Sequence, residues 1–386
     1  MRFGVARLRA LLILAVAGCA TIEAPVVEGE PGAPLPGLTD EQLLRFRQGR
    51  ALFDRAFTPE EGLGPIFNQA RCVSCHDLPE SGGHGAEPVT KVSHYDPDTG
   101  CDPLTRLGGG LLQESVVPAM REAGLRAERT PVEANGVTLM FPPQLFGLGL
   151  VEAVAEERIL SRSDPEDGDG DGISGRPGLD PDGRLARFGL RATHATLDSF
   201  VEEAIRVEMG LTTPEHPEEM LPNGEPLPPG IDAAPDPEVG DSEIALLSDY
   251  VRFLVPNRLV TPPDPVGEEI FRDIGCADCH TPTMTTAPND NPALDRKRFR
   301  IYSDLLLHDM GRELADICTP GSVPGEWRTA PLVGLGLRNR FLHHGQALDL
   351  SLAMEMHGGE ASAARDAFNR LSPARTQRLI AFLKSL

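Results

Sequence analysis

The sequence predicts a mainly α-helical protein with two domains and long irregular loops. Its 386 residues suffice for two ordinary domains, each with its own core. Several stretches repeat apolar residues with the spacing of amphipathic helices, and two of these stretches each precede a Cys-x-x-Cys-His motif. The 36 prolines and 40 glycines indicate many turns and irregular connections between the helices.

The N-terminus has the features of an export signal. Three arginines lie within the first nine residues and precede an apolar run, 11–17, that is too short to span a bilayer. The run ends in Val16-Ala17-Gly18-Cys19, which resembles a bacterial lipobox. We therefore expect residues 1–18 to be a signal peptide and Cys19 to be acylated, giving a periplasm-facing lipoprotein in the outer membrane of a Gram-negative bacterium. An ordinary signal peptide with an incidental cysteine is the alternative.

The segment after the signal is expected to be a tether that leads into the first folded domain. Residues 19–38 combine prolines, glycines and acidic residues, which is typical of an extended, here lipid-anchored, linker. Folded structure is expected from Thr39, because Thr39 and Gln42 fit the two polar positions of a capping box. We expect an N-terminal domain with loop insertions over residues 39–255.

Three further helices are expected in the second half of the chain. Residues 241–254 and 266–274 show helical periodicity, and the prolines between them mark a connector. Ser372 and Pro373 fit the N-cap and first position of a closing helix. These elements predict a C-terminal domain over residues 256–386, whose order of helix, Cys-x-x-Cys-His motif, middle segment and closing helix is that of a small cytochrome c domain.

The two Cys-x-x-Cys-His motifs predict two covalently bound haems of the c type, and hence two cytochrome c-like haem domains. Two cysteines three positions apart can reach the vinyl groups of one porphyrin, and the adjacent histidine can bind its iron. Zinc is the main alternative, but the pairs lie too far apart for a zinc ribbon, and zinc leaves both histidines unexplained. A thioredoxin-like motif would require a βαβ context, which is absent from the sequence. The motif residues are Cys72, Cys75 and His76, and Cys276, Cys279 and His280.

Two cysteines remain outside the motifs and the lipobox. They are Cys101 and Cys318. An oxidising compartment would permit a disulfide between them, and two free buried thiols are the alternative.

Six short stretches resemble the bacterial di-haem oxidoreductases that are described as peroxidases or thiol oxidoreductases. These proteins are relatives of di-haem cytochrome c peroxidase and the MauG-like enzymes. The stretches follow the order of that family over nearly all the chain after residue 39. They are FGLGLVEA (146–153), DGDGDGISGR (167–176), DLLLHDMG (304–311), EWRT (326–329), FLHHG (341–345) and HGGEA (357–361).

The resemblance implies a distal ligand for the iron of the second haem. In the peroxidase relatives, the residue about fourteen positions after the start of a His-x-Gly turn caps the C-terminal haem. Here the turn is His343-His344-Gly345, and the position is occupied by His357. A helix that opens near Asp349 would hold His357 where helix meets loop. A surface histidine is the alternative, and other relatives have Met or Tyr at this place. His308 is expected at the edge of the second haem or in a hydrogen bond to a propionate.

The surroundings of the first haem are less clearly indicated. Peroxide chemistry requires an open iron face and a carboxylate or amide that moves a proton. Glu114, Gln144 and Glu152 are our candidates for this distal pocket. His84 and His94 could occupy the sixth position in a resting state, or they are plain loop histidines.

Two other features have competing interpretations. Trp327 could relay electrons between the haems, or it is an interior aromatic residue with a satisfied N–H group. Asp167, Asp169 and Asp171 match the first half of a calcium loop, but position twelve is Gly178 rather than Glu. The peroxidase relatives hold calcium between their domains, so bound calcium is possible here, and a simple acidic turn is the alternative.

The functional expectation is an exported, peroxidase-like di-haem oxidoreductase. The N-terminal haem would reduce hydrogen peroxide or another small oxidant, and electrons from a redox partner protein would enter through the C-terminal haem. A two-haem electron carrier without enzymatic activity and a MauG-like oxidase that modifies a partner protein are the alternatives. The formal net charge of −22 disfavours nucleic acid and anionic lipid as partners, so membrane contact is expected through the lipid anchor alone.

Overall fold

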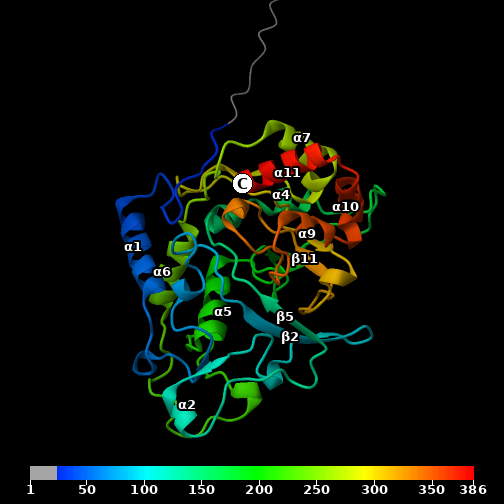
Figure 1. Ribbon diagram of the computed structural model, residues 1–386. Coiled ribbons are helices and arrows are strands. Elements are labelled where there is room, and N and C mark those ends of the chain that lie inside the picture. Colours follow the sequence, from blue (N-terminus) through cyan, green and yellow to red (C-terminus); the bar gives the residue numbers. More distant parts are fainter. Residues whose placement is uncertain (1–23) are drawn as a thin grey trace, which may run out of the picture.

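The computed structural model describes residues 24–386 of the chain. Helices are its main regular elements and long irregular segments join them, so the coarse prediction of a mainly α fold with irregular loops is confirmed (Figure 1). The α-helices are α1 (Asp40–Asp54), α2 (Pro118–Glu122), α3 (Leu148–Glu152), α4 (Glu156–Leu160), α5 (Leu197–Met209), α6 (Asp241–Arg252), α7 (Pro265–Asp273), α8 (Cys276–Cys279), α9 (Leu350–Glu355), α10 (Ser362–Asn369) and α11 (Pro373–Ser385).

The strands are short, and within residues 24–386 they pair only in small antiparallel sheets. They are β1 (Ile66–Phe67), β2 (Val89–Asp96), β3 (Gly100–Asp102), β4 (Ser115–Val116), β5 (Gly136–Met140), β6 (Gly178–Leu179), β7 (Leu185–Ala186), β8 (Thr283–Thr285), β9 (Arg298–Arg300), β10 (Leu307–Asp309) and β11 (Glu326–Arg328). Strand β2 lies between β3 and β5. The pairing of β10 with β11 places His308 opposite Trp327.

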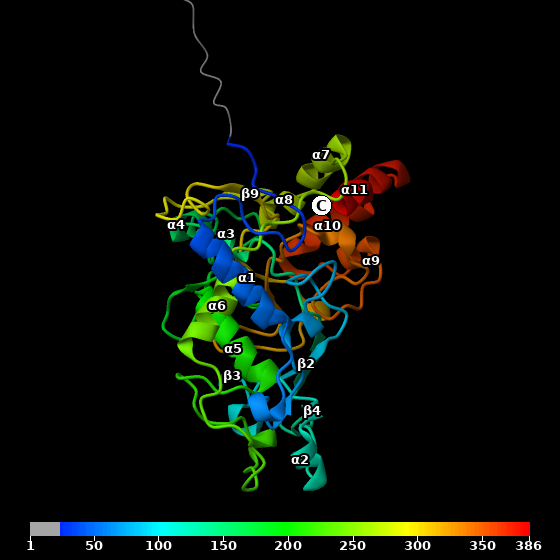
Figure 2. The same ribbon diagram turned by 90° about the vertical axis from the view of Figure 1, so that its left-hand side faces the viewer.

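A layer of helices α1, α6 and α5 forms the core beside the first Cys-x-x-Cys-His motif (Figure 2). The rings of Phe46 and Tyr250 lie 5.1 Å apart, and both side chains are buried. Helix α1 approaches α6 so closely that a Cβ atom at Gly49 would overlap the carbonyl oxygen of Leu246. Glycine at this position therefore sets the distance between the two helices.

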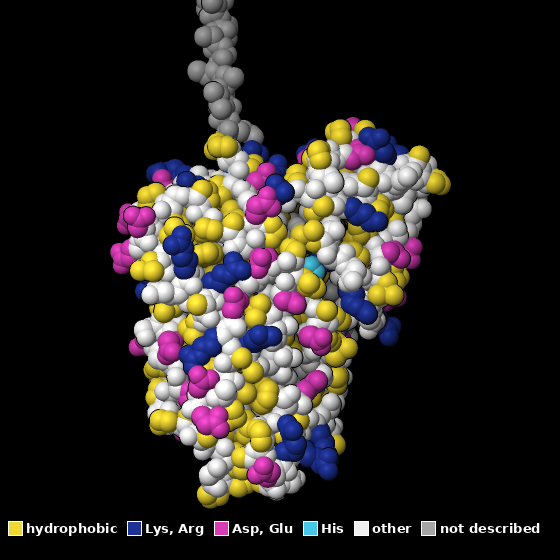
Figure 3. All heavy atoms as spheres, turned by 60° about the vertical axis from the view of Figure 1, so that its left-hand side comes forward, with side chains coloured by type: hydrophobic (Ala, Val, Ile, Leu, Met, Phe, Trp, Pro, Cys, Tyr) yellow, Lys and Arg dark blue, Asp and Glu magenta, His cyan; other side chains and the backbone are white. Residues whose placement is uncertain are grey.

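Helices α7, α10 and α11 form a second group, which we call the C-terminal lobe. Helix α7 packs against α11, and the rings of Phe271 and Phe382 lie 5.4 Å apart. Figure 3 shows a hollow where this lobe meets the rest of the molecule, with a histidine side chain visible in it. Acidic and basic side chains are interspersed over the face in that view.

The helix boundaries agree closely with the sequence patterns. Thr39 caps α1 through the expected box, because it accepts a hydrogen bond from the Gln42 amide and its own amide donates to the Gln42 side chain. Helix α6 ends two residues earlier than expected, at Arg252. Pro373 occupies the first position of α11, although Ser372 at the N-cap makes no side-chain hydrogen bond.

The segment that was expected to be a tether is folded onto the body over residues 24–38. The amides of Val27, Gly29 and Leu35 donate to the carbonyl oxygens of Arg298, Pro256 and Phe253. Leu35 is 2% exposed. The tether prediction is therefore wrong for these residues, since backbone hydrogen bonds and one apolar anchor outweigh a composition rich in proline and glycine. Residues 1–23, including the predicted signal peptide and Cys19, lie outside the described residues.

The predicted division at residues 255 and 256 does not separate two cores. Phe299, Leu305 and Leu306 follow the second motif in the sequence, yet they are buried in the same cluster as Phe46 and Leu150. A separate cluster joins Phe271 to Phe382 in the C-terminal lobe, together with its partners from α9 and α10. The middle of the second half of the chain thus belongs to the first core.

A disulfide and the absence of a membrane helix complete the fold. Cys101 and Cys318 form a disulfide with a Cα–Cα distance of 5.8 Å, as the sequence analysis allowed. The bond ties β3 to the segment after β10. Among residues 24–386, no helix is both long and apolar enough to cross a membrane.

Candidate functional site

The second Cys-x-x-Cys-His motif borders a cavity of about 540 Å³. This volume is within the range of roughly 300–1,000 Å³ that is usual for cofactor and ligand pockets. Mainly apolar side chains from α7, α9, α10 and the segment around Trp327 surround it. Cys276, Cys279 and His280 lie in its wall together with His357.

His280 and His357 are held in the same way on the wall of this cavity. The Nδ1 atom of His280 lies 2.9 Å from the carbonyl oxygen of Tyr302, and Nδ1 of His357 lies 2.7 Å from that of Ala353. A carbonyl oxygen can only accept, so each Nδ1 carries the proton and each Nε2 keeps a free lone pair. Burial lowers the pKa of His280 to about 4 and also lowers the pKa of His357. Two neutral imidazoles whose Nε2 atoms are free to donate an electron pair could hold a haem iron.

The short helix α9 positions His357. Asp349 caps this helix by accepting a hydrogen bond from the Leu352 amide at 2.9 Å. The helix ends at Glu355, and His357 follows directly beyond its C-cap, before Gly358. The predicted location of His357 at a junction of helix and loop is therefore confirmed.

His76 of the first motif shows the arrangement of His280. Its Nδ1 atom lies 3.0 Å from the carbonyl oxygen of Gly83, and burial lowers its pKa. The ring packs near Phe53, and the Cys72 sulfur lies 3.9 Å from that of Met209. Carbonyl oxygens of Gly83 and Pro143 both act on this ring, so the first motif also holds its histidine through backbone carbonyl groups.

The two histidines that were proposed as sixth ligands of the first iron differ in their contacts. The ring of His94 is bound at Nδ1 to the carbonyl oxygen of Glu133, at 2.6 Å. Burial, together with Arg338 and His76 and against the attraction of Asp77, lowers the pKa of His84 to about 4. His84 therefore lies close enough to the first motif to interact with it electrostatically, whereas His94 is engaged elsewhere.

The motif thiols are unsuited to thiol–disulfide exchange. Burial raises the pKa of Cys72, Cys75 and Cys276 to about 12, and it raises that of Cys279 as well. Exchange requires a thiolate, which reactive cysteines obtain through a lowered pKa. The raised pKa values therefore disfavour the thiol-oxidoreductase description given to some of the proteins that the sequence resembles.

Arginines supply positive charge to the cavity, which the sequence analysis missed. Arg187, Arg328 and Arg338 lie in its wall. Burial lowers the pKa of Arg328 to about 10, against the attraction of Asp304, and burial also lowers the pKa of Arg338. Within residues 24–386 neither guanidinium forms an ion pair with a carboxylate, and Arg328 donates to backbone carbonyl oxygens. A buried guanidinium without a paired negative charge is costly. The two propionates of a haem would supply that charge, so the donor set of the cavity fits this cofactor. Arg328 belongs to the EWRT stretch of the family resemblance, and this membership is the signal in the sequence that could have pointed to it.

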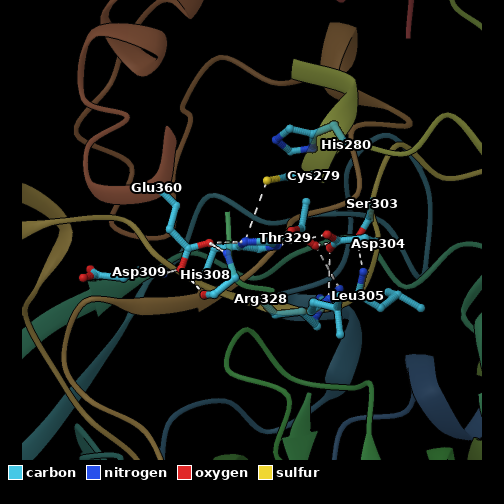
Figure 4. A network of polar contacts seen from close by, with 12 residues as sticks. Cys279, His280, Ser303, Asp304, Leu305, His308, Asp309, Arg328, Thr329 and Glu360 are labelled. Atoms are coloured by element: carbon cyan, nitrogen blue, oxygen red, sulfur yellow. Dashed lines mark hydrogen bonds and ion pairs between the residues drawn. The ribbon is translucent and has the colours of Figure 1, made fainter. Parts of the chain in front are cut away.

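His308 lies between two carboxylates beside the second motif (Figure 4). Its Nδ1 atom is 2.7 Å from Glu360 and its Nε2 atom is 2.9 Å from Asp304, and the Cys279 sulfur lies 3.8 Å from Nδ1. Burial favours the neutral ring, but the hydrogen bonds to Asp304, Cys279 and Glu360 prevail and raise the pKa of His308 to about 12. His308 thus lies beside Cys279 of the second motif, and its place at the edge of a haem stays a prediction. Carboxylates engage both ring nitrogens, which leaves neither nitrogen for a hydrogen bond to a propionate.

The three residues that were proposed for the distal pocket of the first haem do not come together. Glu152 accepts hydrogen bonds from the Leu197 amide at 2.8 Å and from Arg252 at 2.7 Å, so it anchors the start of α5. Gln144 lies in the wall of the second-motif cavity and is bound to Val333 and Asn257.

Glu114 accepts a hydrogen bond from the Thr90 hydroxyl at 2.6 Å in an exposed position. Each of the three candidates is thus engaged by partners of its own, and a role of any one of them in the distal pocket of the first haem stays a prediction.

Glu208 is, among the carboxylates near the first motif, the one whose charge acts on both of its thiols. It accepts a hydrogen bond from the Asn68 side chain at 2.9 Å, and its negative charge acts on the thiols of both Cys72 and Cys75. Burial raises its pKa. Its position near the end of α5, far from the motif in sequence, gave no signal that could have singled it out.

Trp327 is buried in the wall of the second-motif cavity. Its ring stacks on that of His343 at a centroid distance of 3.6 Å, and the Arg191 guanidinium lies 4.6 Å from the ring on which it packs. The indole N–H donates to the Leu314 carbonyl at 2.8 Å, as expected for a satisfied interior tryptophan. A role in electron relay stays a prediction.

The acidic loop differs from the expected calcium pattern. The carboxylates that converge are those of Asp164, Asp167 and Asp169, while Asp171 instead accepts a hydrogen bond from the Ile173 amide at 2.8 Å. The loop is mostly exposed. Calcium binding stays a prediction, with Asp164 in place of Asp171 in the group.

The chain is similar to one known protein family and to solved structures. Residues 136–386, which include the second motif, match the family described as "Di-haem oxidoreductase, putative peroxidase". A solved structure of Kuenenia stuttgartiensis hydrazine synthase, pressurised with 20 bar xenon, is similar at 15% sequence identity and a TM-score of 0.42, over 99% of this chain and 100% of that chain. A MauG-like protein associated with microbial copper homeostasis is similar at 15% identity and a TM-score of 0.42, over 94% of each chain. No curated protein matches the chain.

Proposed function

This chain belongs to the di-haem oxidoreductase family, and we propose that it is an exported peroxidase-type enzyme with two covalently bound haems of the c type. Each haem would be attached in a cytochrome c-like setting through the cysteines of one motif. Hydrogen peroxide would be reduced near the first motif, and electrons from a redox partner protein would enter near the second. The proposal concerns the reaction, its direction and the location, which go beyond family membership.

The observation that carries the proposal is the unequal supply of histidines at the two motifs. Two neutral histidines, His280 and His357, border one cavity with their Nδ1 atoms tied to carbonyl oxygens. At the first motif, within residues 24–386, only His76 has this arrangement. Bis-histidine ligation favours a six-coordinate iron for electron storage, whereas a single protein ligand leaves a face open for a small oxidant.

The residues of the chain would have separate tasks in the reaction. Haem iron, when bound, supplies the electrons that peroxide takes up. The carbonyl oxygens of Gly83 and Tyr302 orient the rings of His76 and His280 through their Nδ1–H groups. Arg328 and Arg338 would offset propionate charge in the second cavity.

Proton delivery is assigned to Glu208. Peroxide reduction consumes two electrons and two protons and releases two molecules of water, so a proton must reach the oxygen that leaves as water. Burial raises the pKa of Glu208, which lets its carboxyl group keep a proton at higher pH than an exposed glutamate. A carboxyl group with a raised pKa is a suitable general acid for this step. After release of its proton, Glu208 would be reprotonated from solvent.

A second function is favoured by the position of His84. Burial lowers the pKa of this histidine to about 4, so its ring is neutral and able to bind iron, and it lies near His76. If His84 occupied the sixth position of the first iron permanently, both irons would be saturated. The protein would then be a two-haem electron carrier without enzymatic activity.

Ligand binding and turnover distinguish these two functions. The purified holoprotein, with its second haem reduced, is mixed with hydrogen peroxide and with cyanide while its absorption spectrum is recorded. The enzyme is expected to bind cyanide at one haem and to oxidise a reduced cytochrome or dye in a peroxide-dependent manner. Absence of both effects, also in the His84→Gln variant, would count decisively against peroxidase function.

Export and lipidation are part of the proposal and have their own test. Cys19 in its lipobox-like context supports acylation of the mature N-terminus. Cells expressing the full chain are fed a labelled fatty acid, and the label is expected on the wild type but not on Cys19→Ser. Equal labelling of both would contradict the anchor, and Cys19→Ser released into the periplasmic fraction would support it.

A further inference from the structure

We propose that His308 is a positioning residue of the second haem site, where its ring fastens the segment that orients His280 to the segment that carries His357. The inference rests on the proposed ligation of that haem by these two histidines. His308 touches neither of them in a hydrogen bond and acts through Asp304 and Glu360.

The link to His280 runs through Asp304. The carbonyl oxygen of Tyr302 holds Nδ1 of His280, and Asp304 follows only two residues later. Asp304 is 2% exposed, and it accepts hydrogen bonds from His308 Nε2 and from the Leu306 amide. A movement of the Asp304 carboxylate would therefore be transmitted to the carbonyl group that sets the His280 ring.

The link to His357 runs through Glu360. Glu360 follows His357 by three residues, and one of its carboxylate oxygens accepts from His308 Nδ1 and from the Ser174 amide at 3.0 Å. The other oxygen accepts from the Ser174 hydroxyl at 2.6 Å and from the Asp309 amide at 3.0 Å. A Cβ atom at Gly359 would overlap the carbonyl oxygen of Asp309, so this turn is packed tightly against β10.

The ring must donate from both nitrogens to make the two contacts. Carboxylates accept hydrogen bonds, and only a protonated imidazole has two N–H donors. His308 is 3% exposed. Loss of its charge would therefore take from Asp304 and Glu360 the positive ring to which both carboxylates are bound. Removing one member of a buried ionic group is strongly unfavourable, which makes the arrangement stiff. Figure 4 shows His308 between Glu360 and Asp304, below Cys279 and His280 in that view.

Another trio in this cluster, Cys279, Asp304 and His308, has the composition of a metal site. Attachment of a haem would consume the thiol of Cys279 in a thioether bond and remove it as a thiolate ligand. Moreover, Glu360 already occupies Nδ1 of His308. The geometry therefore points to a link between the segment that orients His280 and the segment that carries His357, rather than to a separate metal site.

The test compares the second haem in His308→Gln, Glu360→Gln and wild-type holoprotein. The electron paramagnetic resonance spectrum and the midpoint potential of each haem are measured, with haem content and circular dichroism as controls for folding. We expect His308→Gln to lose most of the low-spin signal of the second haem and to shift its potential. Added imidazole is expected to restore the low-spin signal, since it can replace a displaced His357.

Glu360→Gln keeps the inference testable if His308→Gln does not fold, because it retains the ring and one oxygen acceptor. It is expected to change the same signal to a smaller extent. His194→Gln is the matched control: His194 also pairs with a carboxylate, Glu203, at 2.8 Å, but has no contact with the second motif in the described residues. Its second haem is expected to match the wild type.

Folded His308→Gln and Glu360→Gln with wild-type signal and potential at the second haem would overturn the inference, and so would an equal change in His194→Gln. The proposed peroxidase function fails separately. A wild-type protein without peroxide reduction but with the His308-dependent signal would refute the enzyme and leave the positioning role in place.

Discussion

The surroundings of the two Cys-x-x-Cys-His motifs differ in how their residues are assembled. Around the second motif, a cavity, two carbonyl-bound histidines, several arginines and the His308 group converge from α8, α9, α10 and the segments near β10 and β11. Around the first motif, His76 is oriented in the same way, but the neighbouring polar groups are Glu208 and His84. The same five-residue motif can therefore serve different roles, because the role is decided by what distant segments bring to the iron.

The largest effect is expected from Glu208→Gln, which tests the first region alone. Loss of a general acid typically lowers the rate by roughly 10²–10⁴-fold, so peroxide-dependent donor oxidation should fall by this factor. The spectrum of the second haem should stay unchanged. Glu202→Gln on the same helix is the control, since Glu202 is bound to the Thr213 hydroxyl instead. Full activity in Glu208→Gln would remove this residue from the mechanism.

Phe299→Ala tests whether the two regions fold as one unit. Phe299 follows the second motif but is 1% exposed in the core that contains Phe46. Truncation of such a buried ring costs about 3–5 kcal/mol. Denaturant unfolding should shift for the signals of both haems together. A shift that is confined to the second haem would show that the regions are independent after all.

Removal of the disulfide should have a somewhat smaller effect. Cys101→Ala with Cys318→Ala deletes the bond between β3 and the segment after β10, which closes a long loop. Such a bond contributes about 2–4 kcal/mol to the free energy of unfolding. Denaturation of the double variant is compared with that of the oxidised wild type. Equal stability would mean that the bond does not restrain the unfolded chain.

The smallest effect concerns the pH dependence of an acidic cluster in the irregular segment before α6, which serves as a reference outside both motif regions. Burial, together with Glu238, Asp232 and Asp236, raises the pKa of Glu219 to about 8. The folded state therefore prefers protonated Glu219, and the stability that comes from this preference is lost as the pH rises from the pKa of an unfolded glutamate toward 8. Glu219→Gln should flatten the thermal stability between these limits. A variant whose melting temperature falls with pH as steeply as that of the wild type would contradict this assignment.

The local parts of both sites were predictable from the sequence, and the long-range parts were not. The caps of α1 and α9 depend on neighbours within a few positions, and these patterns were interpreted correctly. The motif residues depend on such neighbours too, and their role in haem attachment stays a prediction. His357 was identified from the spacing of residues in the family that the sequence resembles, and not from the residues around it. Glu208 and Arg338 reach their places only through the packing of distant segments, which periodicity and composition do not encode.

Residues 24–38 show the opposite limitation. Their prolines, glycines and acids are typical of a tether, yet Leu35 is buried and the backbone pairs with residues near 253–257 and 298. The composition of a segment indicates its conformational preference as an isolated chain. It does not indicate whether other parts of the fold offer unpaired backbone groups with which the segment can form hydrogen bonds.

The electron paramagnetic resonance spectrum of the resting, fully oxidised holoprotein tests the inequality of the two haem sites most directly. We predict one low-spin ferric haem, which disappears in His357→Gly, and one ferric haem that is high-spin or becomes so in His84→Gln. Two low-spin haems that persist in both variants would contradict it, because then neither His357 nor an open first iron would distinguish the two sites.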